Sequence, residues 1–227
     1  MNSVLRSHDR LARLQWARER LCWGKTEWGN VFFSGEMKFN LSLEGELQLI
    51  KRRGERNRRN RNRQLNNGTD LLGRRNVLVW AGVSKGGKSD LVFINGELTP
   101  EKYIDEVIRQ NVMLFAGAIG LDDFYFQDDE RWPHQTSIVT ELLESESIDR
   151  LEWPPKSDDL SPMENLWDVL ARRAATRLHA SSSLNDLKEV LQEEWRAIPQ
   201  KSIDEDIDKM RSRLVECLDA NGGRVFF

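Results

Sequence analysis

The sequence predicts one α/β domain built on a mixed β-sheet with helices on both faces. Three observations lead to this prediction. The chain has 227 residues, 39% of them hydrophobic, which is enough to bury a core. Short apolar runs typical of antiparallel strands come first, and strands then alternate with helical patterns. An antiparallel part followed by interleaved strands and helices favours a mixed sheet that is covered on both sides.

The first predicted helix covers residues 7–23. Leu11, Leu14, Ala17 (or Arg18) and Leu21 recur there at helical spacing, and arginines occupy the other face. This pattern predicts an amphipathic helix that leads into the domain.

A strand with a glycine inside it follows the first helix. The run VFFSGEMKFN, Val31 to Asn40, is apolar and aromatic on both sides of Gly35. Glycine weakens a strand interior and often marks a bulge, a bend or a close backbone approach. We therefore expect two strands here, at about 30–34 and 38–43. Gly35 is either the bend between them or the place of a lost functional side chain.

The remaining elements follow from turn residues, caps and periodicity. Glu44-Gly45 predicts a turn, Thr99-Pro100 and Ser161-Pro162 predict helix starts, and Gly222 predicts the end of the last helix. The predicted strands lie at 46–51, 76–84, 90–96, 124–128 and 148–154, and the predicted helices at 99–116, 134–145, 161–178, 183–198 and 202–223.

Composition excludes several classes of protein. The net charge of -3 does not indicate a nucleic-acid binder, so any such site must be a local basic patch. Cys22 and Cys217 are too far apart in sequence for a disulfide framework or a zinc site, and they suit a reducing compartment. No apolar stretch reaches membrane-spanning length, and we expect no membrane partner and no secretory signal.

Two groups of carboxylates are candidates for chemistry. Asp128 and Asp129 end a predicted strand, and Glu164 lies in the first turn of a predicted helix. Ligands bind at the carboxyl ends of strands in α/β sheets, and carboxylate oxygens suit Mg²⁺ or Mn²⁺. The structural alternative is that Asp129 only ends its strand and that Glu164 complements the helix N-terminus.

The sequence motifs around these carboxylates resemble those of the Tc1/mariner transposases. FQDDERWPH is similar to the motif with their second catalytic aspartate, and WPPKSDDLSPMENLWDVL to the motif with their third carboxylate. The 34 residues between Asp129 and Glu164 match the Tc1 branch, and the resemblance runs from about residue 8 to the closing DKMRSRLVECLDANGG. It implies a ribonuclease-H-like fold of the DDE integrase and transposase type, a five-stranded mixed sheet flanked by helices. It also implies three carboxylates that hold two divalent ions for DNA cleavage and strand transfer.

The resemblance places Gly35 at the position of the first catalytic aspartate. Glycine has no carboxylate, so only Asp129 and Glu164 remain as implied catalytic and metal-binding residues, with Mg²⁺ or Mn²⁺ bound weakly or not at all. Successive strand residues point to opposite faces, so we expect Glu36 to point away from the pocket and Asp128 to point away from the side of Asp129. These departures predict impaired metal-dependent cleavage.

Other departures concern the motifs and the domains. Glu130-Arg131-Trp132 replace the usual Asn-Ala-Pro, and Asp158 and Ser161 replace a usual proline and asparagine. We expect the N-terminal helix-turn-helix pair of the family to be missing from this chain. We expect an N-terminal helix in residues 1–25 and the ribonuclease-H-like domain in residues 26–227, with a basic loop insertion at 51–70.

That insertion contains the strongest local charge of the chain. Eight basic residues and one acidic residue lie between Lys51 and Arg63. Arginine and asparagine suit phosphate contacts, and in the family this region leads to a loop that crosses a dimer and contacts DNA. A solvated disordered loop and a nuclear localisation signal remain alternatives. The predicted nucleic-acid-binding residues are Lys51, Arg52, Arg53, Arg56, Arg58, Arg59, Arg61 and Arg63.

Other conspicuous residues have structural explanations. His134 could approach the metal pocket, but a lone histidine is more often structural. We expect core positions for Trp153, Trp167 and Trp195, and a solvated face for Arg172, Arg173 and Arg177.

Three functional hypotheses remain at this point. The first is a domesticated or decayed transposase domain in the nucleus that binds nucleic acid or protein partners, with a homodimer as a possible state. The second is an active magnesium-dependent transposase or endonuclease with a substitute ligand. The third is that Gly35 was introduced to trap an inactive form.

Overall fold

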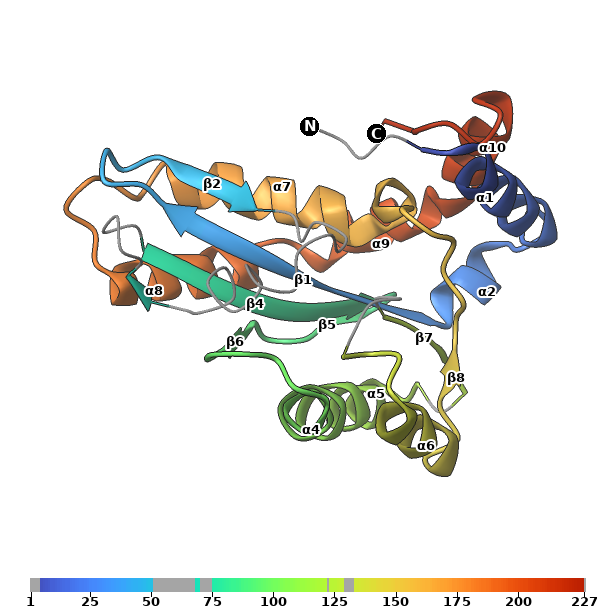
Figure 1. The fold of residues 1–227 in the computed structure, drawn as a ribbon, viewed down its shortest axis with the longest axis horizontal. Coiled ribbons are helices and arrows are strands. Elements are labelled where there is room, and N and C mark those ends of the chain that lie inside the picture. The colour runs from blue at the N-terminus through green and yellow to red at the C-terminus, as the bar shows by residue number, and fades with distance from the viewer. Residues whose placement is uncertain (1–4, 51–67, 70–74, 122, 129–132, 227) are drawn as a thin grey trace.

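The computed structural model describes residues 5–50, 68–69, 75–121, 123–128 and 133–226 (Figure 1). The strands are β1 (Val31–Leu41), β2 (Leu47–Ile50), β3 (Gly68–Thr69), β4 (Arg75–Ser84), β5 (Gly87–Lys88), β6 (Val92–Ile94), β7 (Tyr125–Gln127) and β8 (Asp149–Arg150). The helices are α1 (Ser7–Glu19), α2 (Lys25–Gly29), α4 (Pro100–Lys102), η1 (Tyr103–Met113), α5 (Leu114–Ile119), α6 (Ser137–Ser145), η2 (Asp158–Leu160), α7 (Pro162–Ala175), α8 (Leu184–Arg196), α9 (Gln200–Asp208) and α10 (Met210–Asp219). None of the described helices is long and apolar enough to cross a membrane.

The strands form one mixed sheet, as predicted. Its main path runs β3-β4-β1-β7-β8, while β2 pairs with β1, and β5 and β6 pair with β4. The pairs of β1 with β2 and β4 are antiparallel, whereas β7 is parallel to β1 and β8 is parallel to β7. The mixture arises because hairpins build the first half of the sheet and helical crossovers build the second.

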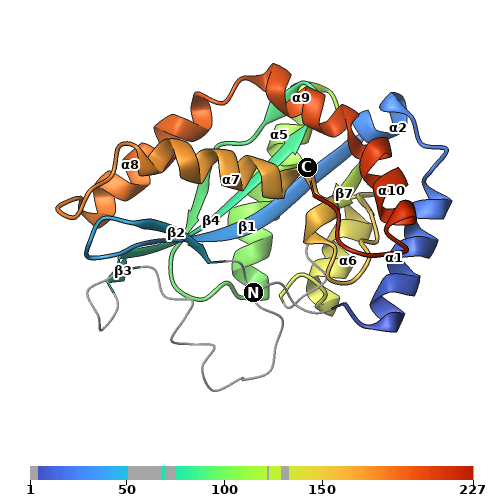
Figure 2. The ribbon, with the colours of Figure 1, turned by 90° about the horizontal axis from the view of Figure 1, so that it is seen from above.

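Helices cover both faces of the sheet, which confirms the predicted fold class. Helices α7 to α10 lie on one side, and α4, η1, α5 and α6 lie on the other (Figures 1 and 2). Each side has its own hydrophobic core. Odd-numbered residues of β1, such as Phe33 and Met37, enter the core under α7, and Phe32 enters the core under η1. Trp153, Trp167 and Trp195 are buried as expected.

β1 is one unbroken strand, so the prediction of two strands separated at Gly35 is wrong. β4 pairs with β1 over nine successive residue pairs without a change of register, and Gly35 lies opposite Ala81. This continuous ladder contains no bulge at the glycine. Buried apolar residues on both sides of Gly35 pair across the strands, and their packing outweighs the weak strand propensity of one residue.

Helix α1 buries Leu14 and Ala17, as predicted, but the rest of its buried face differs from the prediction. Leu11 is 66% exposed, whereas the side chain of Arg13 is fully buried beside Trp16. Arg13 can be buried because a carboxylate and backbone carbonyls accept hydrogen bonds from its guanidinium. The spacing of hydrophobic residues cannot predict a buried arginine of this kind.

The last predicted helix is two helices, α9 and α10, that meet at Lys209. The carbonyl of Asp206 accepts hydrogen bonds from the Lys209 N–H (3.3 Å) and from the buried Arg213 guanidinium (3.2 Å). These bonds tighten the end of α9 and replace the regular helical bond of this carbonyl. The predicted end is confirmed, because Gly222 has φ 72° and its N–H donates to the Cys217 carbonyl at 2.8 Å.

The predicted helix at 99–116 is present but is not α-helical throughout. Thr99 accepts a hydrogen bond from the Lys102 N–H, with Pro100 at the first helical position, as expected. From Tyr103 to Met113 the chain is a π-helix, before α5 continues. A sequence pattern with a period near 3.6 residues does not distinguish this wider turn.

A buried ion pair joins α1 to the segment before α7. Arg13 and Asp159 form a bidentate ion pair, with Nη1–Oδ1 at 2.9 Å and Nη2–Oδ2 at 2.7 Å. Burial raises the pKa of Asp159, but hydrogen bonds from Arg13 and from the Val225 N–H, with Arg224 nearby, outweigh it and hold the pKa below the usual value. Asp159 is therefore charged, and it stabilises the fold in that form.

We predict that Asp159→Asn lowers the free energy of unfolding at pH 7 by on the order of 3 kcal/mol, because it leaves Arg13 buried without its anion. The folded-state pKa lies below the unfolded one. The contribution is therefore fully present above about pH 5 and is lost as the pH falls through the folded-state pKa. Urea unfolding of both proteins across this range measures the difference. A gap that stays constant down to about pH 2.5 would contradict the assignment.

Candidate functional site

Gly35 lies on the face of the sheet that helix α7 covers. A Cβ atom built on Gly35 would lie 3.6 Å from Nε1 of Trp167 and 3.8 Å from Cβ of Met163, which are ordinary van der Waals distances. Both neighbours are buried side chains of α7. A side chain at this position would therefore enter the space between β1 and the first turns of α7.

Glu36 lies on the other face of β1, which confirms that it points away from this space. Its Oε1 is 3.3 Å from Nε2 of His134, and both side chains are almost completely buried. The imidazole also packs edge-on against the ring of Tyr103 in η1, with the ring centroids 4.2 Å apart. The surroundings of His134 thus support its structural interpretation.

Asp128 follows β7 and is buried with a cationic neighbour. Its Oδ1 is 3.3 Å from Nε of Arg150 in β8, and the carboxylate is 2% exposed. The same arginine donates from Nη2 to the carbonyl of His134 at 3.0 Å. Asp128 is therefore paired with Arg150. It directly follows β7, the strand that lies beside β1 in the sheet.

Polar side chains join β1, β7 and the start of α7. The hydroxyl of Ser34 donates to the carbonyl of Gln127 at 2.9 Å, and the hydroxyl of Ser161 lies 3.5 Å from Oε1 of Gln127. Gln127 also donates to the carbonyl of Asp128 at 3.0 Å. Ser34 and Gln127 were not among the predicted site residues. Their positions directly before the carboxylate motifs were the available signal.

Glu164 lies in the first turn of α7, as predicted. Ser161 caps this helix by accepting a hydrogen bond from the Met163 N–H at 3.3 Å, and Pro162 occupies the first helical position. Glu164 is half-buried, and the positive end of the helix dipole stabilises its negative charge. It lies next to Met163, which faces Gly35.

Two groups of predicted site residues lie outside the part of the chain that the structure describes. One is Asp129, and Asp128 is the last described residue before it. The other is the basic run: Lys51, Arg52, Arg53, Arg56, Arg58, Arg59, Arg61 and Arg63. The register of β1 and β7 ends at the pair Phe33↔Gln127, two residues before Gly35 on one strand and two before Asp129 on the other.

The described residues, which do not include Asp129, do not gather a set of metal ligands. No group of three or more His, Cys, Asp and Glu side chains within the described ranges could hold a metal ion. Gly35 offers no oxygen donor toward α7, and Glu36 is held on the opposite face by His134.

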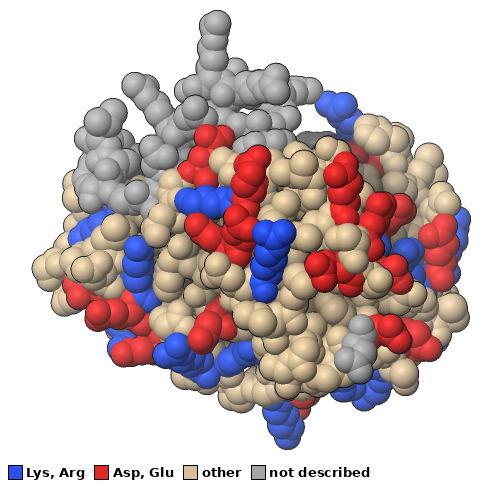
Figure 3. Space-filling model, turned by 90° about the horizontal axis from the view of Figure 1, so that it is seen from below, with Lys and Arg blue, Asp and Glu red and all other residues tan. Residues whose placement is uncertain are grey.

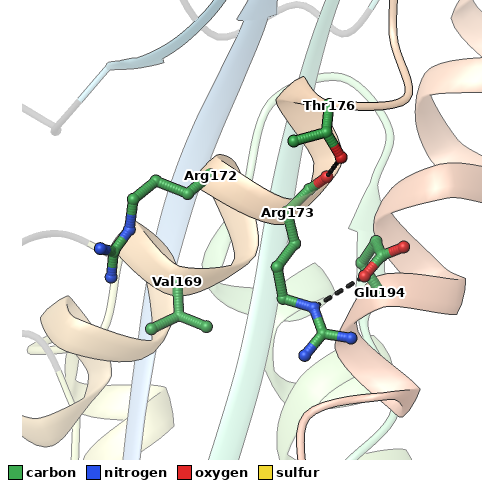
Figure 4. Close-up of a pocket in the computed structure, with 5 residues that line it drawn as sticks. All are labelled: Val169, Arg172, Arg173, Thr176 and Glu194. Atoms are coloured by element: carbon green, nitrogen blue, oxygen red, sulfur yellow. Dashed lines mark hydrogen bonds and ion pairs between the residues drawn. The ribbon is translucent and has the colours of Figure 1, made fainter.

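A surface cavity of about 460 Å³ lies between α7 and α8 (Figure 4). It is lined by Val169, Arg172, Arg173, Thr176 and Glu194. Nε of Arg173 donates to Glu194 at 2.7 Å, and Nη1 of Arg177 donates to the same carboxylate at 2.9 Å. Arg172 and Arg177 are exposed, as expected of a solvated face, and the glutamates of α8 balance this charge.

The opposite side of the molecule also carries mixed charge. Acidic and basic side chains are interspersed on the face with α4, η1, α5 and α6 (Figure 3). An extended basic surface is not visible on this face among the residues that are described there. Local basic charge is thus most concentrated, by sequence, in residues 51–63.

Comparison with known proteins gives a consistent result. The chain is 34% identical over 215 residues to the transposable element Tcb2 transposase of Caenorhabditis briggsae, covering 94% of this chain and 76% of that protein. It is 30% identical to the Tc1 transposase of Caenorhabditis elegans over 220 residues, again with 94% and 76% covered. No protein-family model matches the chain.

Solved structures show the same fold at lower identity. The catalytic domain of Mos1 mariner transposase superimposes with a TM-score of 0.73 at 15% identity and covers 100% of both chains. The Mos1 mariner paired-end complex with Mn gives a TM-score of 0.76 at 14% identity, and the present chain spans 66% of that transposase. Sequence relatives and fold agree, so the chain belongs to the Tc1/mariner family of transposases and has the fold of their catalytic domain.

Proposed function

We propose that this protein is a domesticated transposase domain that binds DNA in the nucleus and is impaired in metal-dependent DNA cleavage. The observation that carries the proposal is the glycine on β1. Gly35 faces the helix of Glu164 with no donor atom, at the position where the family resemblance places a metal-binding aspartate. Two carboxylates, Asp129 and Glu164, then remain of the three. They cannot clamp two ions as phosphodiester chemistry requires.

Neighbouring acids do not compensate for this loss. Moving Glu36 to the α7 side would reverse the alternation of β1 and break its pair with His134. Moving the carboxylate of Asp128 would leave Arg150 without its anion in a largely buried place.

DNA is the proposed partner because of the family and the basic run. Solved Mos1 relatives include a paired-end complex with the left transposon end and a strand transfer complex. In this chain, Lys51 to Arg63 supply eight cationic side chains that suit phosphate contacts without sequence selectivity. A nuclear location follows from this partner, and the same run suits a nuclear localisation signal.

An active magnesium-dependent transposase or endonuclease is the second candidate. One observation favours it: α7 still presents Glu164 in its first turn, and a side chain at position 35 would meet that helix at van der Waals distance without a clash. Catalysis would require an oxygen donor from elsewhere to enter that space.

The third hypothesis, that Gly35 was introduced to trap an inactive form, concerns the origin of the glycine rather than its chemistry. It makes the same prediction for the cleavage assay as the proposed function does.

We predict that Gly35→Asp creates Mn²⁺-dependent nicking of supercoiled DNA, while the unaltered protein is at least about 100-fold slower. The aspartate fits because its Cβ would meet only van der Waals neighbours. Calorimetric titration should show tighter Mn²⁺ binding by the variant. Glu164→Gln in the Gly35→Asp protein should abolish both effects, and Glu36→Gln should abolish neither.

Two results would count against the proposed function. Cleavage by the unaltered protein that disappears with Asp129→Ala would establish the second candidate. Equal Mn²⁺ affinity with and without the aspartate would show that position 35 is not the missing ligand.

We predict that replacing Arg56, Arg58, Arg59, Arg61 and Arg63 by alanine weakens DNA binding and flattens its salt dependence. Each lost phosphate contact reduces the slope of log K against log salt by about 0.9, so five contacts reduce it by up to about 4.5. Fluorescence anisotropy with duplex DNA at several salt concentrations measures the slope. Replacing Arg173 and Arg177 by alanine provides the control, because Glu193 and Glu194 already balance their charge.

An unchanged slope would remove the basic run from the DNA interface. If the unaltered protein has no affinity for nucleic acid, protein binding becomes the better account of its function. Recovery of the same partners from nuclear extract with and without nuclease would then support that account.

A further inference from the structure

One face of helix α1 contacts the segment that leads into α7. Asp9, Arg13 and Trp16 lie four and three residues apart, so their side chains share this face. All three are buried, although two of them carry charge. Each has a partner between Glu152 and Asp159.

Arg13 makes the central contacts. Its Nη1 donates to the Ser157 hydroxyl at 2.8 Å and to Oδ1 of Asp159 at 2.9 Å, and its Nη2 donates to Oδ2 of Asp159 at 2.7 Å. A planar guanidinium fixes both the distance and the orientation of a carboxylate, which an ammonium group cannot do. Arg13 thus sets the place of η2, which begins at Asp158.

Trp16 and Asp9 hold the preceding residues. Nε1 of Trp16 donates to the Glu152 carbonyl at 2.7 Å, and its ring packs edge-on against Trp153 with centroids 4.6 Å apart. Asp9 accepts from Nζ of Lys156 at 2.7 Å. Lys156 has φ 54°, a backbone conformation that costs energy for a residue with a side chain, so this contact stabilises a strained turn.

Residues 222–225 also contact the pair of Arg13 and Asp159. Arg13 also donates from Nε to the Gly222 carbonyl at 3.0 Å and from Nη2 to the Gly223 carbonyl at 2.7 Å. Arg224 and the Val225 N–H bind the two oxygens of Asp159 at 2.6 and 2.9 Å. The hydrogen-bonding groups of both ions are therefore well satisfied inside the protein.

We infer that Asp9, Arg13 and Trp16 are positioning residues that fix the entry into α7 and, through it, the place of Glu164. The path is short. Asp159 lies in η2, Ser161 caps α7 and approaches Gln127, and Glu164 follows in the first turn. The role of Glu164 rests on the proposed function, whereas the positioning of the helix entry does not.

Native-state hydrogen exchange tests this inference without any metal or DNA. In Arg13→Lys, the amides of Leu160, Ser161 and Met163 should exchange at least about tenfold faster relative to amides of β4. These amides donate to Ser157, Asp158 and Ser161, so they report the structure of the entry. Lysine keeps the positive charge but loses the two-pronged geometry.

Arg75→Lys is the matched control. Arg75 donates to the carbonyls of Ala180 and Ser42 from β4, far along the chain from the entry into α7. It should lower global stability while leaving the relative exchange of Leu160 and Ser161 unchanged. Trp16→Phe is a milder second variant, because it keeps an aromatic ring but removes the hydrogen bond to Glu152, and it should give a smaller local increase.

The two possible roles give different patterns of exchange. A local increase at Leu160, Ser161 and Met163 in Arg13→Lys or Trp16→Phe, absent in the control, supports positioning. Exchange that rises uniformly across α7 and β4, in proportion to the loss of global stability, would overturn it and leave these residues with a general stabilising role. If Arg13→Lys does not fold, Trp16→Phe decides between the two.

Discussion

The alternation of side chains along β1 is the constraint on which the rest of the site depends. The ladder with β4 fixes the register, and the two cores bury both faces of the strand. A residue of β1 therefore cannot change sides without moving apolar neighbours into the wrong core. Gly35 faces α7 and Glu36 faces His134 for this reason. An acid at the adjacent position of the strand therefore cannot place its carboxylate at the candidate site.

Pairing of buried polar side chains reinforces this constraint. Glu36 contacts His134, Asp128 is paired with Arg150, and Asp159 is paired with Arg13. Burying a polar or charged group is costly unless a partner and hydrogen bonds compensate, so each pair holds both of its members in place. The acids near the candidate site are consequently part of the framework. Glu164 differs because it lies half-buried at a helix start, where a carboxylate is stabilised by the helix itself.

Local chemistry in the sequence predicted the helix starts and the layered fold well. Ser161-Pro162 and Thr99-Pro100 cap helices as expected, because capping depends on a few adjacent residues. The failures involve partners that are distant in sequence. The strand did not break at Gly35 because β4 supplies a continuous ladder, and Arg13 was assigned to a solvated face because its acceptors lie more than 140 residues away. Strand alternation correctly predicted that Glu36 points away from α7, but its buried neighbour His134 is distant in sequence and is seen only in the structure.

The bond between Arg13 and the Gly222 carbonyl spans 209 residues of sequence. Contacts of such separation form late, since closing long loops costs entropy before any contact rewards it. Helix α1 is synthesised long before these carbonyls, so Arg13 completes its set of acceptors only when the last helix has been made. A chain cut before Gly222 would keep the pair of Arg13 with Asp159 but would lose the carbonyl acceptors of Gly222 and Gly223. Such a truncation would loosen the attachment of α1 without removing it.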